Sequence, residues 1–312
     1  MLLSLRDITI RQLRAVAAIT RTGKITLAAH ELCLTPPAVT EQLKLLEDRL
    51  GLRLFQRTRA GLMPTDAGVH LAETAARMEA LLSVSAEQLR ALKGLDGGRV
   101  IIGVVGTAKY YAPQLAAAFA ECYPKIELQL RIGNRSEIVA ALASYEIDVA
   151  IMGRPPEGVP VKRASFGPHP HIVIAPPTHP LTTECGPIER QRLAGEKMLV
   201  REAGSGTRRL FEKLFAGIAP AQPSIRIEIS SNETIKQAVM AGLGIAFISA
   251  HTVELEVQTE RLAILNIEGL PAWREWFLMH REDKELTPAA EAFWQFVLEK
   301  GRGFLPRVPG VE

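Results

Sequence analysis

Cysteine is scarce in this sequence, and its arrangement indicates no chemistry. The 312 residues contain only Cys33, Cys122 and Cys185, which lie far apart and form no CxxC pair. An odd, scattered set cannot build a disulfide framework and lacks the paired spacing of a zinc or redox site. We therefore expect reduced cysteines and no metal.

Long hydrophobic runs are also missing. No stretch approaches the roughly 18 to 20 apolar residues of a membrane-spanning helix, and Arg6 and Asp7 interrupt the N-terminus before the apolar core of an export signal could form. Apolar residues still make up 47% of the chain, which is enough for the cores of about two domains. These features predict a soluble, cytoplasmic protein with no membrane partner.

Net charge is low, at +3, but it is unevenly placed. Residues 1–65 hold ten Lys or Arg against five Asp or Glu, so this segment carries +5 and the remainder about −2. A basic segment on a nearly neutral chain indicates a local site for a polyanion. A chance imbalance in a small domain is the alternative reading.

Three short helices open the chain. The first should begin at Thr9, which starts a capping box, and the second should cover residues 25–32. After a tight connection, Thr35 can cap a third helix with Pro36 at its first position and Leu50 at its end. Two helices joined by a short connection are typical of a helix-turn-helix.

A hairpin should follow over residues 52–65. Arg57 and Arg59 are two apart, so on a strand both would project from one face, where they could contact successive phosphates. Alone, such arginines are usually just solvated charges. Downstream of a helix-turn-helix they predict the wing of a winged helix.

The next segment, residues 66–93, contains no proline and should be one linker helix. Its apolar positions repeat in heptads, which favours dimerisation over the alternative of a helix packed on its own domain. Glycines at 94, 97 and 98 then mark a hinge. The heptad positions are Leu71, Ala75, Met78, Leu82, Ser85, Leu89 and Leu92.

Beyond residue 94, strand and helix patterns alternate, which predicts parallel sheets in an α/β domain. We expect two lobes, lobe I at about residues 99–163 and 268–300 and lobe II at about 164–267, joined by crossing strands with a ligand cleft between them. Expected strands are 99–105, 126–132, 147–152, 171–175, 198–201, 225–229, 245–248 and 275–280, and expected helices are 111–122, 136–144, 207–216, 233–241 and 288–299.

Small polar residues follow several of these strands, where helix N-termini offer free backbone N–H groups to anions. The clearest candidate for such an anion site is the glycine-containing loop around Ser205, although it lacks the Lys of a Walker loop. Ordinary helix capping is the alternative for each position. The candidate effector-binding residues are Thr107, Lys109, Asn134, Arg135, Arg154, Glu202, Ser205, Gly206, Thr207, Arg208 and Asn232.

Catalytic patterns are absent from the sequence. No GxSxG, HExxH or GxGxxG motif follows the elements that it requires, so we expect no enzyme. His169 and His171 lie two apart beside prolines, and we expect them on loop and strand surface rather than on a metal.

Taken together, these segments resemble the LysR-type transcriptional regulators over essentially the whole chain. The run LGLRLFQR at residues 50–57 and the order of winged helix, linker helix and two-lobed domain carry the resemblance. Residues 35–40, 205–208 and 232–239 further resemble the subgroup that regulates carbon-dioxide-fixation operons.

The resemblance implies a homodimer or homotetramer that binds an interrupted palindrome upstream of a target operon. It also implies a coinducer between the lobes and no bond-making chemistry or enzymatic cofactor. In the subgroup the coinducer would be a phosphorylated metabolite or NADPH, which agrees with the anion-binding junctions. The fold class is thus a mainly α winged helix-turn-helix with a long linker helix, followed by an α/β, two-lobed effector domain like the periplasmic binding proteins.

The DNA-facing residues follow from the same comparison. Many family members have Gln and Arg where this chain has Pro36 and Glu41, so base readout should differ in detail; Glu41 could accept from a cytosine amino group. Lys24 replaces a Ser cap that is frequent in the family. The candidates are Thr35, Pro36, Pro37, Thr40 and Gln42 near bases, with Lys44, Arg57 and Arg59 nearer the phosphates.

Two other functional classes remain as alternatives. A periplasmic solute-binding protein shares the two-lobed architecture but would need an export signal and no winged helix. A deaminase or transferase would need a converging acid, base and nucleophile, and the sequence offers no such set.

Overall fold

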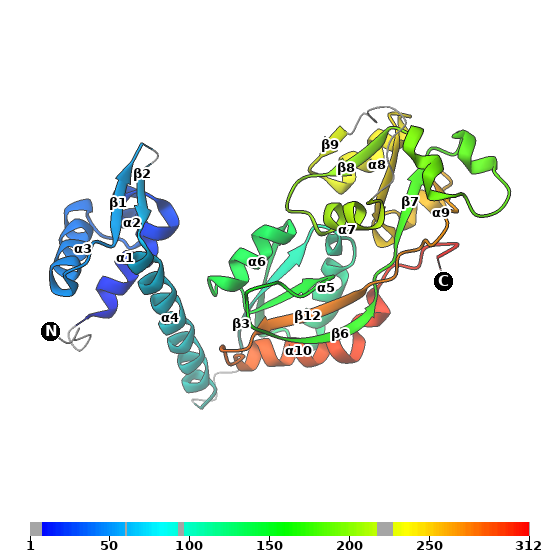
Figure 1. The fold of residues 1–312 in the computed structure, drawn as a ribbon. Helices are drawn as coiled ribbons and strands as arrows, with labels where there is room; N and C mark the ends of the chain where they lie inside the picture. Colours follow the sequence, from blue (N-terminus) through cyan, green and yellow to red (C-terminus); the bar gives the residue numbers. More distant parts are fainter. Residues whose placement is uncertain (1–7, 60, 93–96, 217–226, 312) are drawn as a thin grey trace. The chain divides into compact units, whose positions relative to one another are not determined.

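The structure is a computed structural model that describes residues 8–59, 61–92, 97–216 and 227–311. The chain divides into two units, Met1–Ala86 and Glu87–Glu312 (Figure 1). The expected hinge glycine at position 94 and the first two residues of the strand expected at 225–229 lie outside the described residues.

Three helices open the first unit, each beginning or ending where the sequence predicts. They are α1 (Ile10–Thr22), α2 (Ile25–Glu31) and α3 (Pro36–Leu50). Thr9 forms the expected capping box with Gln12, and the Thr35 hydroxyl accepts from the N–H of Ala38. Lys24 makes no side-chain capping bond to α2. These short helices are stabilised by a shared apolar core rather than by length.

The predicted hairpin is present as β1 (Phe55–Thr58) and β2 (Gly61–Pro64), paired antiparallel with Arg57 opposite Leu62. Arg59 lies in the turn after β1 and not in the strand. The expectation that Arg57 and Arg59 share one strand face is therefore wrong, because the strand ends at Thr58. Both side chains are nevertheless exposed.

Helix α4 (Asp66–Leu92) realises the predicted linker helix, but its heptad positions divide into two groups. Leu71 and Ala75 are buried in the core of the first unit, so the first half of α4 packs on its own domain. Farther along, Leu82 is 44% exposed and Leu89 is 60% exposed. Among the side chains that the structure describes, those of the second half therefore keep a larger apolar surface for a partner.

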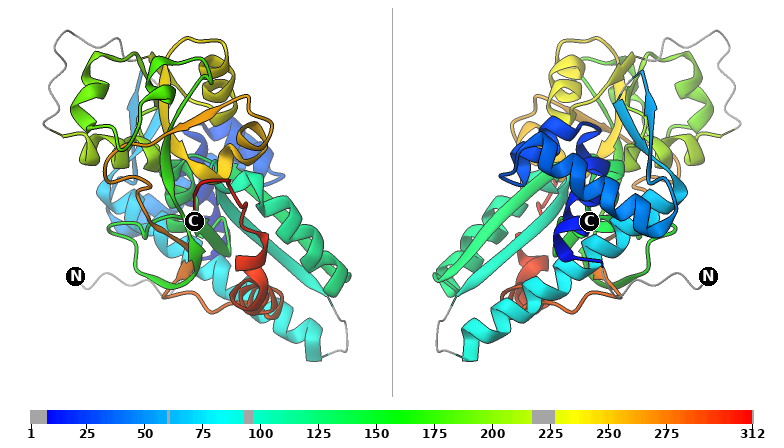
Figure 2. Two further views of the ribbon diagram at one scale, coloured as in Figure 1. Left: turned by 90° about the vertical axis from the view of Figure 1, so that its right-hand side faces the viewer. Right: turned by 90° about the vertical axis from the view of Figure 1, so that its left-hand side faces the viewer.

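The second unit contains two sheets, and each is the centre of a lobe (Figures 1 and 2). In lobe I the strand order is β4-β3-β5-β12-β6. Phe119 of α5 packs on Phe293 of α10 beside this sheet. The elements of lobe I are β3 (Gly98–Val105), η1 (Ala108–Tyr110), α5 (Ala112–Cys122), β4 (Ile126–Gly133), α6 (Arg135–Ala143), β5 (Val149–Met152), β6 (Val161–Pro168), β12 (Glu275–Arg281), α10 (Pro288–Lys300) and η5 (Gly301–Phe304).

Lobe II is built around the strand order β11-β7-β10-β8-β9. Its apolar core has two clusters, one containing Phe211 and Phe247 and the other containing Ile235 and Ile248. The elements of lobe II are β7 (His171–Ala175), η2 (Pro180–Thr183), η3 (Arg190–Gly195), β8 (Met198–Arg201), α7 (Gly206–Leu214), β9 (Ile227–Ile229), α8 (Asn232–Met240), β10 (Ile245–Ser249), η4 (Ala250–Thr252), α9 (Glu254–Gln258) and β11 (Ala263–Leu265).

Three stretches of chain cross between the lobes. Two are antiparallel neighbours: the N–H of His169 donates to the carbonyl of Arg274 at 2.7 Å, and the N–H of Ala272 donates to His171 at 2.8 Å. The third is the C-terminal tail, which leaves α10 and runs to lobe II (Figure 2). Its Leu305 is buried in the core of lobe I and its Val308 in the core of lobe II.

The sheets are mixed rather than parallel, which corrects the sequence-based expectation. β12 pairs antiparallel with both β5 and β6, and β7 pairs antiparallel with β10 and β11. The sequence patterns do not predict β6 and β11, because β6 is an edge strand with one buried residue and β11 has three residues. Within the described part of the chain, no helix is both long and apolar enough to cross a membrane.

Candidate effector cavity and DNA-binding surface

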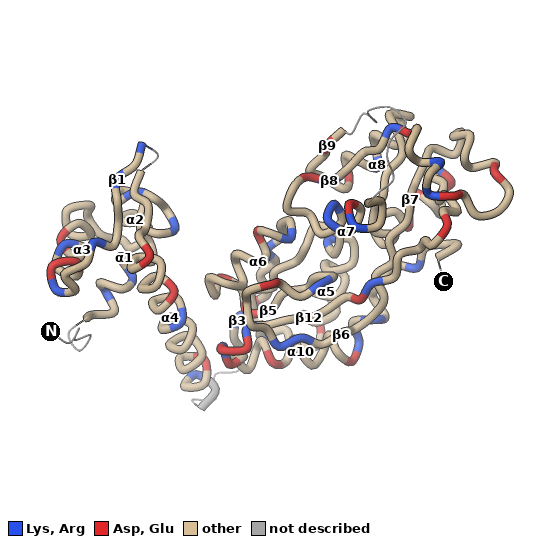
Figure 3. Tube along the Cα trace, viewed as in Figure 1, with Lys and Arg blue, Asp and Glu red and all other residues tan. Residues whose placement is uncertain are grey.

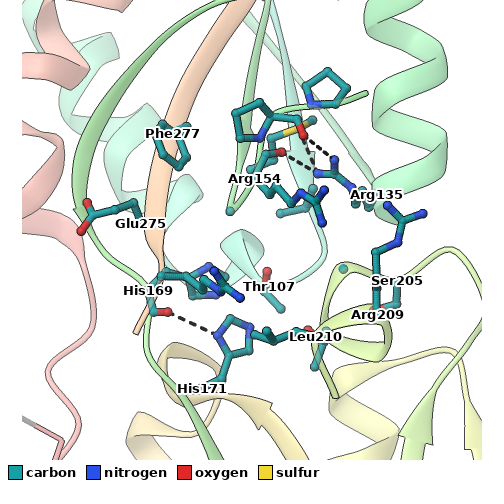
Figure 4. Close-up of a pocket in the computed structure, with 18 of the residues that line it drawn as sticks. Thr107, Arg135, Arg154, His169, His171, Ser205, Arg209, Leu210, Glu275 and Phe277 are labelled. Carbon is teal, nitrogen blue, oxygen red and sulfur yellow. Dashed lines mark hydrogen bonds between the residues drawn. The ribbon is translucent and has the colours of Figure 1, made fainter. Parts of the chain in front are cut away.

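A cavity of about 710 Å³ lies between the lobes of the second unit (Figure 4). Its walls come from the carboxyl ends of β3, β4, β5 and β8, together with the crossing strands near His169 and Arg274. Ligands of α/β sheets bind at the carboxyl ends of strands, and this volume suits a small organic molecule.

The helix starts at these strand ends differ in how they are capped. Asn134 caps α6: its Oδ1 accepts from the N–H of Glu137 at 3.0 Å, and Glu137 accepts from the N–H of Asn134 at 2.9 Å. Ser205 precedes α7, yet its hydroxyl makes no capping bond to that helix. The first N–H groups of α7 therefore offer an anion a site that no serine cap occupies.

Seven of the eleven predicted effector residues line the cavity: Thr107, Asn134, Arg135, Arg154, Ser205, Gly206 and Thr207. The other four do not line it. Lys109 lies over the ring of Tyr110. Glu202 and Asn232 both accept from Arg201, and Arg208 pairs with Glu212.

Positive charge dominates the cavity wall. Seven cationic side chains line it against two carboxylates, Glu157 and Glu275. Burial lowers the pKa of Arg135, and the nearby Arg154 and Arg209 lower it further. Cations crowded in this way favour an anionic ligand. The seven are Arg135, Arg154, Arg163, Arg201, Arg209, Lys213 and Arg274.

Helix α7 carries two pairs of charged residues at a spacing of four, and the two pairs differ in sign and in position. Arg208 and Glu212 are four residues apart and form an ion pair outside the cavity lining. Arg209 and Lys213 have the same spacing, but both are cations and both line the cavity. A like-charged pair at this spacing destabilises a helix by a few tenths of a kcal/mol, and a bound anion would reverse that cost.

Arg201 is a buried cation in this wall that the sequence reasoning missed. Its guanidinium donates to both carboxylate oxygens of Glu202, at 2.7 and 2.9 Å, and to the side chain of Asn232. All four residues of β8 are buried. An arginine that ends an otherwise apolar strand, followed at once by a glutamate, was the available signal.

A second feature missed from the sequence is the burial of the crossing-strand histidines. His169 and His171 are 4% and 3% exposed, so the expected surface location is wrong. The ring of His169 stacks on Trp276 at 3.7 Å between centroids, and its Nε2 is 2.9 Å from the hydroxyl of Ser249. Trp276 in turn donates from Nε1 to Nδ1 of His251 at 3.0 Å.

Burial keeps these histidines neutral. It lowers the pKa of His171 to about 3 and that of His251 to about 4, and it also holds the pKa of His169 well below its usual value. The positive charge of the cavity therefore comes from its arginine and lysine side chains and not from these histidines.

The predicted DNA-facing residues lie on or beside α3 and at the hairpin. Thr35, Pro36, Pro37, Thr40 and Lys44 are exposed on or beside α3, while Gln42 is half-buried. The hydroxyl of Thr40 donates to the carbonyl of Pro36 at 2.9 Å. Basic positions follow on α3 and along β1 (Figure 3). This arrangement matches a recognition helix with an adjacent wing.

Glu47 fixes the wing to α3, although no sequence motif distinguishes it from the other acidic residues of this unit. Its carboxylate is buried and accepts from the N–H of Leu54 at 2.7 Å and from Arg53 at 2.9 Å. The start of the hairpin is thereby tied to the end of the recognition helix.

Two family models match this architecture. The model described as "Bacterial regulatory helix-turn-helix protein, lysR family" matches residues 10–69, and "LysR substrate binding domain" matches residues 93–302. The chain belongs to the LysR family of transcriptional regulators. This confirms the predicted fold class and the predicted role as a DNA-binding regulator, and the family's members are regulators rather than enzymes.

Relatives within the LysR family match along nearly the full chain. The "HTH-type transcriptional regulator CbbR" of Sinorhizobium medicae (strain WSM419) is 49% identical over 97% of both chains. The "RuBisCO operon transcriptional regulator" of Allochromatium vinosum is 41% identical over 94% of this chain and 96% of its own. The resemblance to the carbon-dioxide-fixation subgroup is thereby confirmed.

One solved structure similar to the effector unit contains a small molecule. The regulatory domain of Synechocystis PCC6803 CcmR in complex with 2-PG is 33% identical, with a TM-score of 0.60, and covers 65% of this chain and 96% of its own.

Among the residues described for this LysR protein, no group of three or more His, Cys, Asp or Glu could hold a metal ion.

Proposed function

We propose that this regulator controls a carbon-fixation operon in response to a small anionic coinducer, such as a phosphorylated metabolite or NADPH, that binds between the lobes. The name of the Allochromatium vinosum relative supports the target operon. The ligand in the CcmR structure supports a small molecule in the effector domain.

The observation that carries the ligand class is a pair of cations on α7, Arg209 and Lys213, that line the cavity and form no ion pair with any described residue. Arg209 lies in the first turn of the helix and near Arg135, whereas Lys213 lies in the last turn. Arginine forks and helix N-termini are the usual partners of phosphate and carboxylate groups. Thr107, Asn134 and Thr207 would add neutral hydrogen bonds that orient the ligand.

On the DNA side, we propose that Thr35, Pro36, Pro37, Thr40 and Gln42 lie near bases and that Lys44, Arg57 and Arg59 lie near phosphates. A homodimer or homotetramer formed through the exposed second half of α4 would place two such surfaces on the halves of an interrupted palindrome. Its site of action would be the cytoplasm, where the operon lies.

Isothermal titration with 2-PG and with NADPH tests the ligand class. Arg209→Ala and Lys213→Ala should each weaken binding of the preferred anion about threefold to tenfold, because each removes a charge-assisted contact. The loss should shrink at high salt. Arg192→Ala is the matched control, since Arg192 pairs with Glu184 and does not line the cavity.

Two results would count against this proposal. One is an affinity for both ligands too weak to measure at low salt. The other is an equal loss of affinity in the Arg192 control and in the two α7 variants.

A further inference from the structure

Tyr110 brings the two lobes into direct contact next to the cavity. It ends η1 of lobe I, and its hydroxyl donates to the Oε2 of Glu233 in α8 of lobe II at 3.2 Å. Its ring faces the ammonium of Lys236, with Nζ 4.8 Å from the ring centroid. One side chain of lobe I thus contacts both a carboxylate and a cation of lobe II.

The lobe II side of this contact is an ion cluster in which Lys236 and Glu256 are buried and Glu233 is exposed. Lys236 is 4% exposed, and its Nζ lies 2.8 Å from Glu256 and 3.0 Å from Glu233. Burying an ammonium costs free energy unless it is paired with other groups, and an aromatic face adds a further attraction. Separating the lobes would remove the ring of Tyr110 from Lys236 and let water reach the cluster.

Two weaker bonds span the lobes near the same edge. Asn232 donates from Nδ2 to the carbonyl of Gly106 at 3.2 Å, and Ser136 donates to the carbonyl of Gly204 at 3.4 Å. Asn232 also accepts from Arg201, which is one of the cavity cations. Asn232 therefore contacts both the other lobe and a residue of the cavity wall, so a movement of the lobes would also move that wall.

We propose that Tyr110 is a positioning residue, and that Tyr110, Glu233, Lys236 and Glu256 form an interlobe latch that holds the lobes in the arrangement in which the cavity is assembled. Tyr110 does not line the cavity, so it acts on a ligand only through the orientation of the lobes. The latch rests on the proposed function only for its effect on ligand affinity.

The chain contains a matched cluster that does not span the lobes. Tyr145 donates to the Oδ2 of Asp283 at 2.6 Å, and the guanidinium of Arg281 lies 4.2 Å from its ring centroid. All three residues belong to lobe I. Tyr145→Phe therefore removes the same kind of hydrogen bond as Tyr110→Phe without touching the interface between the lobes.

The first test measures the distance between the lobes and needs no ligand. Cys122 in lobe I and Cys185 in lobe II are both exposed, so both can carry a spin label. A full-length Cys33→Ser variant, spin-labelled at both cysteines and diluted with unlabelled protein, reports the distance between the lobes. Tyr110→Phe should broaden or shift this distance distribution, and Tyr145→Phe should leave it unchanged. An unchanged distribution in Tyr110→Phe overturns the latch.

The second test is titration with 2-PG. Tyr110→Phe should weaken binding about threefold to tenfold, the effect of losing one hydrogen bond that pre-organises the site, while Tyr145→Phe should not. Equal affinities of Tyr110→Phe and the wild type overturn the positioning role. If the wild-type protein does not bind 2-PG but Tyr110→Phe changes the interlobe distance, this ligand is wrong and the latch stands.

Discussion

At the scale of single residues, Glu47 shows how one buried carboxylate joins two elements. It accepts from the N–H groups of Leu54 and Phe55 and from Arg53. Glu47→Ala leaves two backbone donors without this acceptor, so we expect the DNA-binding unit to lose roughly 2 kcal/mol of stability.

Hydrogen exchange at the start of the hairpin measures this effect. Glu41→Ala, which removes an exposed carboxylate from the same helix, is the control and should change the stability by less than about 0.5 kcal/mol. Equal exchange rates in the two variants would show that Glu47 does not anchor the hairpin.

The buried histidines predict a pH dependence of stability. Because the pKa of His251 is about 4 in the folded state and near 6.5 when unfolded, the unfolded chain takes up protons first as the pH falls. Stability should be constant above about pH 6.5. It should then fall between pH 6.5 and 4 by up to about 1.4 kcal/mol per pH unit for this histidine.

Urea unfolding followed by tryptophan fluorescence measures this slope in the effector unit, because all three tryptophans lie there. His251→Asn keeps an acceptor for Trp276 but does not titrate in this range, so its slope should be smaller. The same slope in the variant and the wild type would mean that His251 does not cause it.

Some of the cavity residues could be predicted from the sequence, and others could not. Thr107, Asn134 and Ser205 could be predicted because each follows a strand whose apolar run fixes where it ends. Arg163 and Arg274 could not, since they join one cavity wall only when β6 and β12 pair across more than a hundred residues of sequence. The sequence around His169 predicts a surface position. Its burial depends on tertiary contacts of the segment that crosses between the lobes, and a local sequence pattern does not reveal such contacts.

At the scale of elements, local chemistry predicted the helices better than the strands. The caps at Thr9 and Thr35 determine where α1 and α3 begin whatever the rest of the chain does. Strand β6 has no such signal, and its place at a sheet edge depends on tertiary pairing with β12. The heptad pattern of α4 predicted a helix correctly but did not show that its first half is buried within its own domain.

Helix α3 and the hairpin should contribute differently to DNA binding. Arg57→Ala should weaken binding to all duplexes and lower the slope of log affinity against log salt by about one, because one phosphate contact is lost. Thr40→Ala should instead reduce discrimination between operator and scrambled DNA, because a contact near the bases changes.

Fluorescence anisotropy at two salt concentrations, with DNA from upstream of the neighbouring genes and a scrambled duplex, separates these effects. The assignment of roles would be wrong if both variants lost the same affinity on both duplexes and kept the wild-type salt slope.

At the scale of the whole molecule, the chain of the effector unit leaves lobe I, returns to it and then leaves it again. The chain builds four strands of lobe I, crosses to make the sheet of lobe II, and returns with β12, which lies between β5 and β6 in the first sheet. The C-terminal tail then crosses once more and buries Val308 in the core of lobe II. The return with β12 completes one wall of the cavity, since β12 and the segment before it supply Arg274, Glu275 and Phe277.

The insertion of β12 also determines when the sensor can exist during synthesis. Met152 ends β5 and Glu275 begins β12, so 122 residues must be translated between these partner strands. At roughly 5 to 20 residues per second, β5 waits about 6 to 25 s with an open edge, a state that invites wrong pairing and chaperone binding. The DNA-binding unit can fold long before that. A growing chain can therefore carry a finished DNA reader before its sensor is complete.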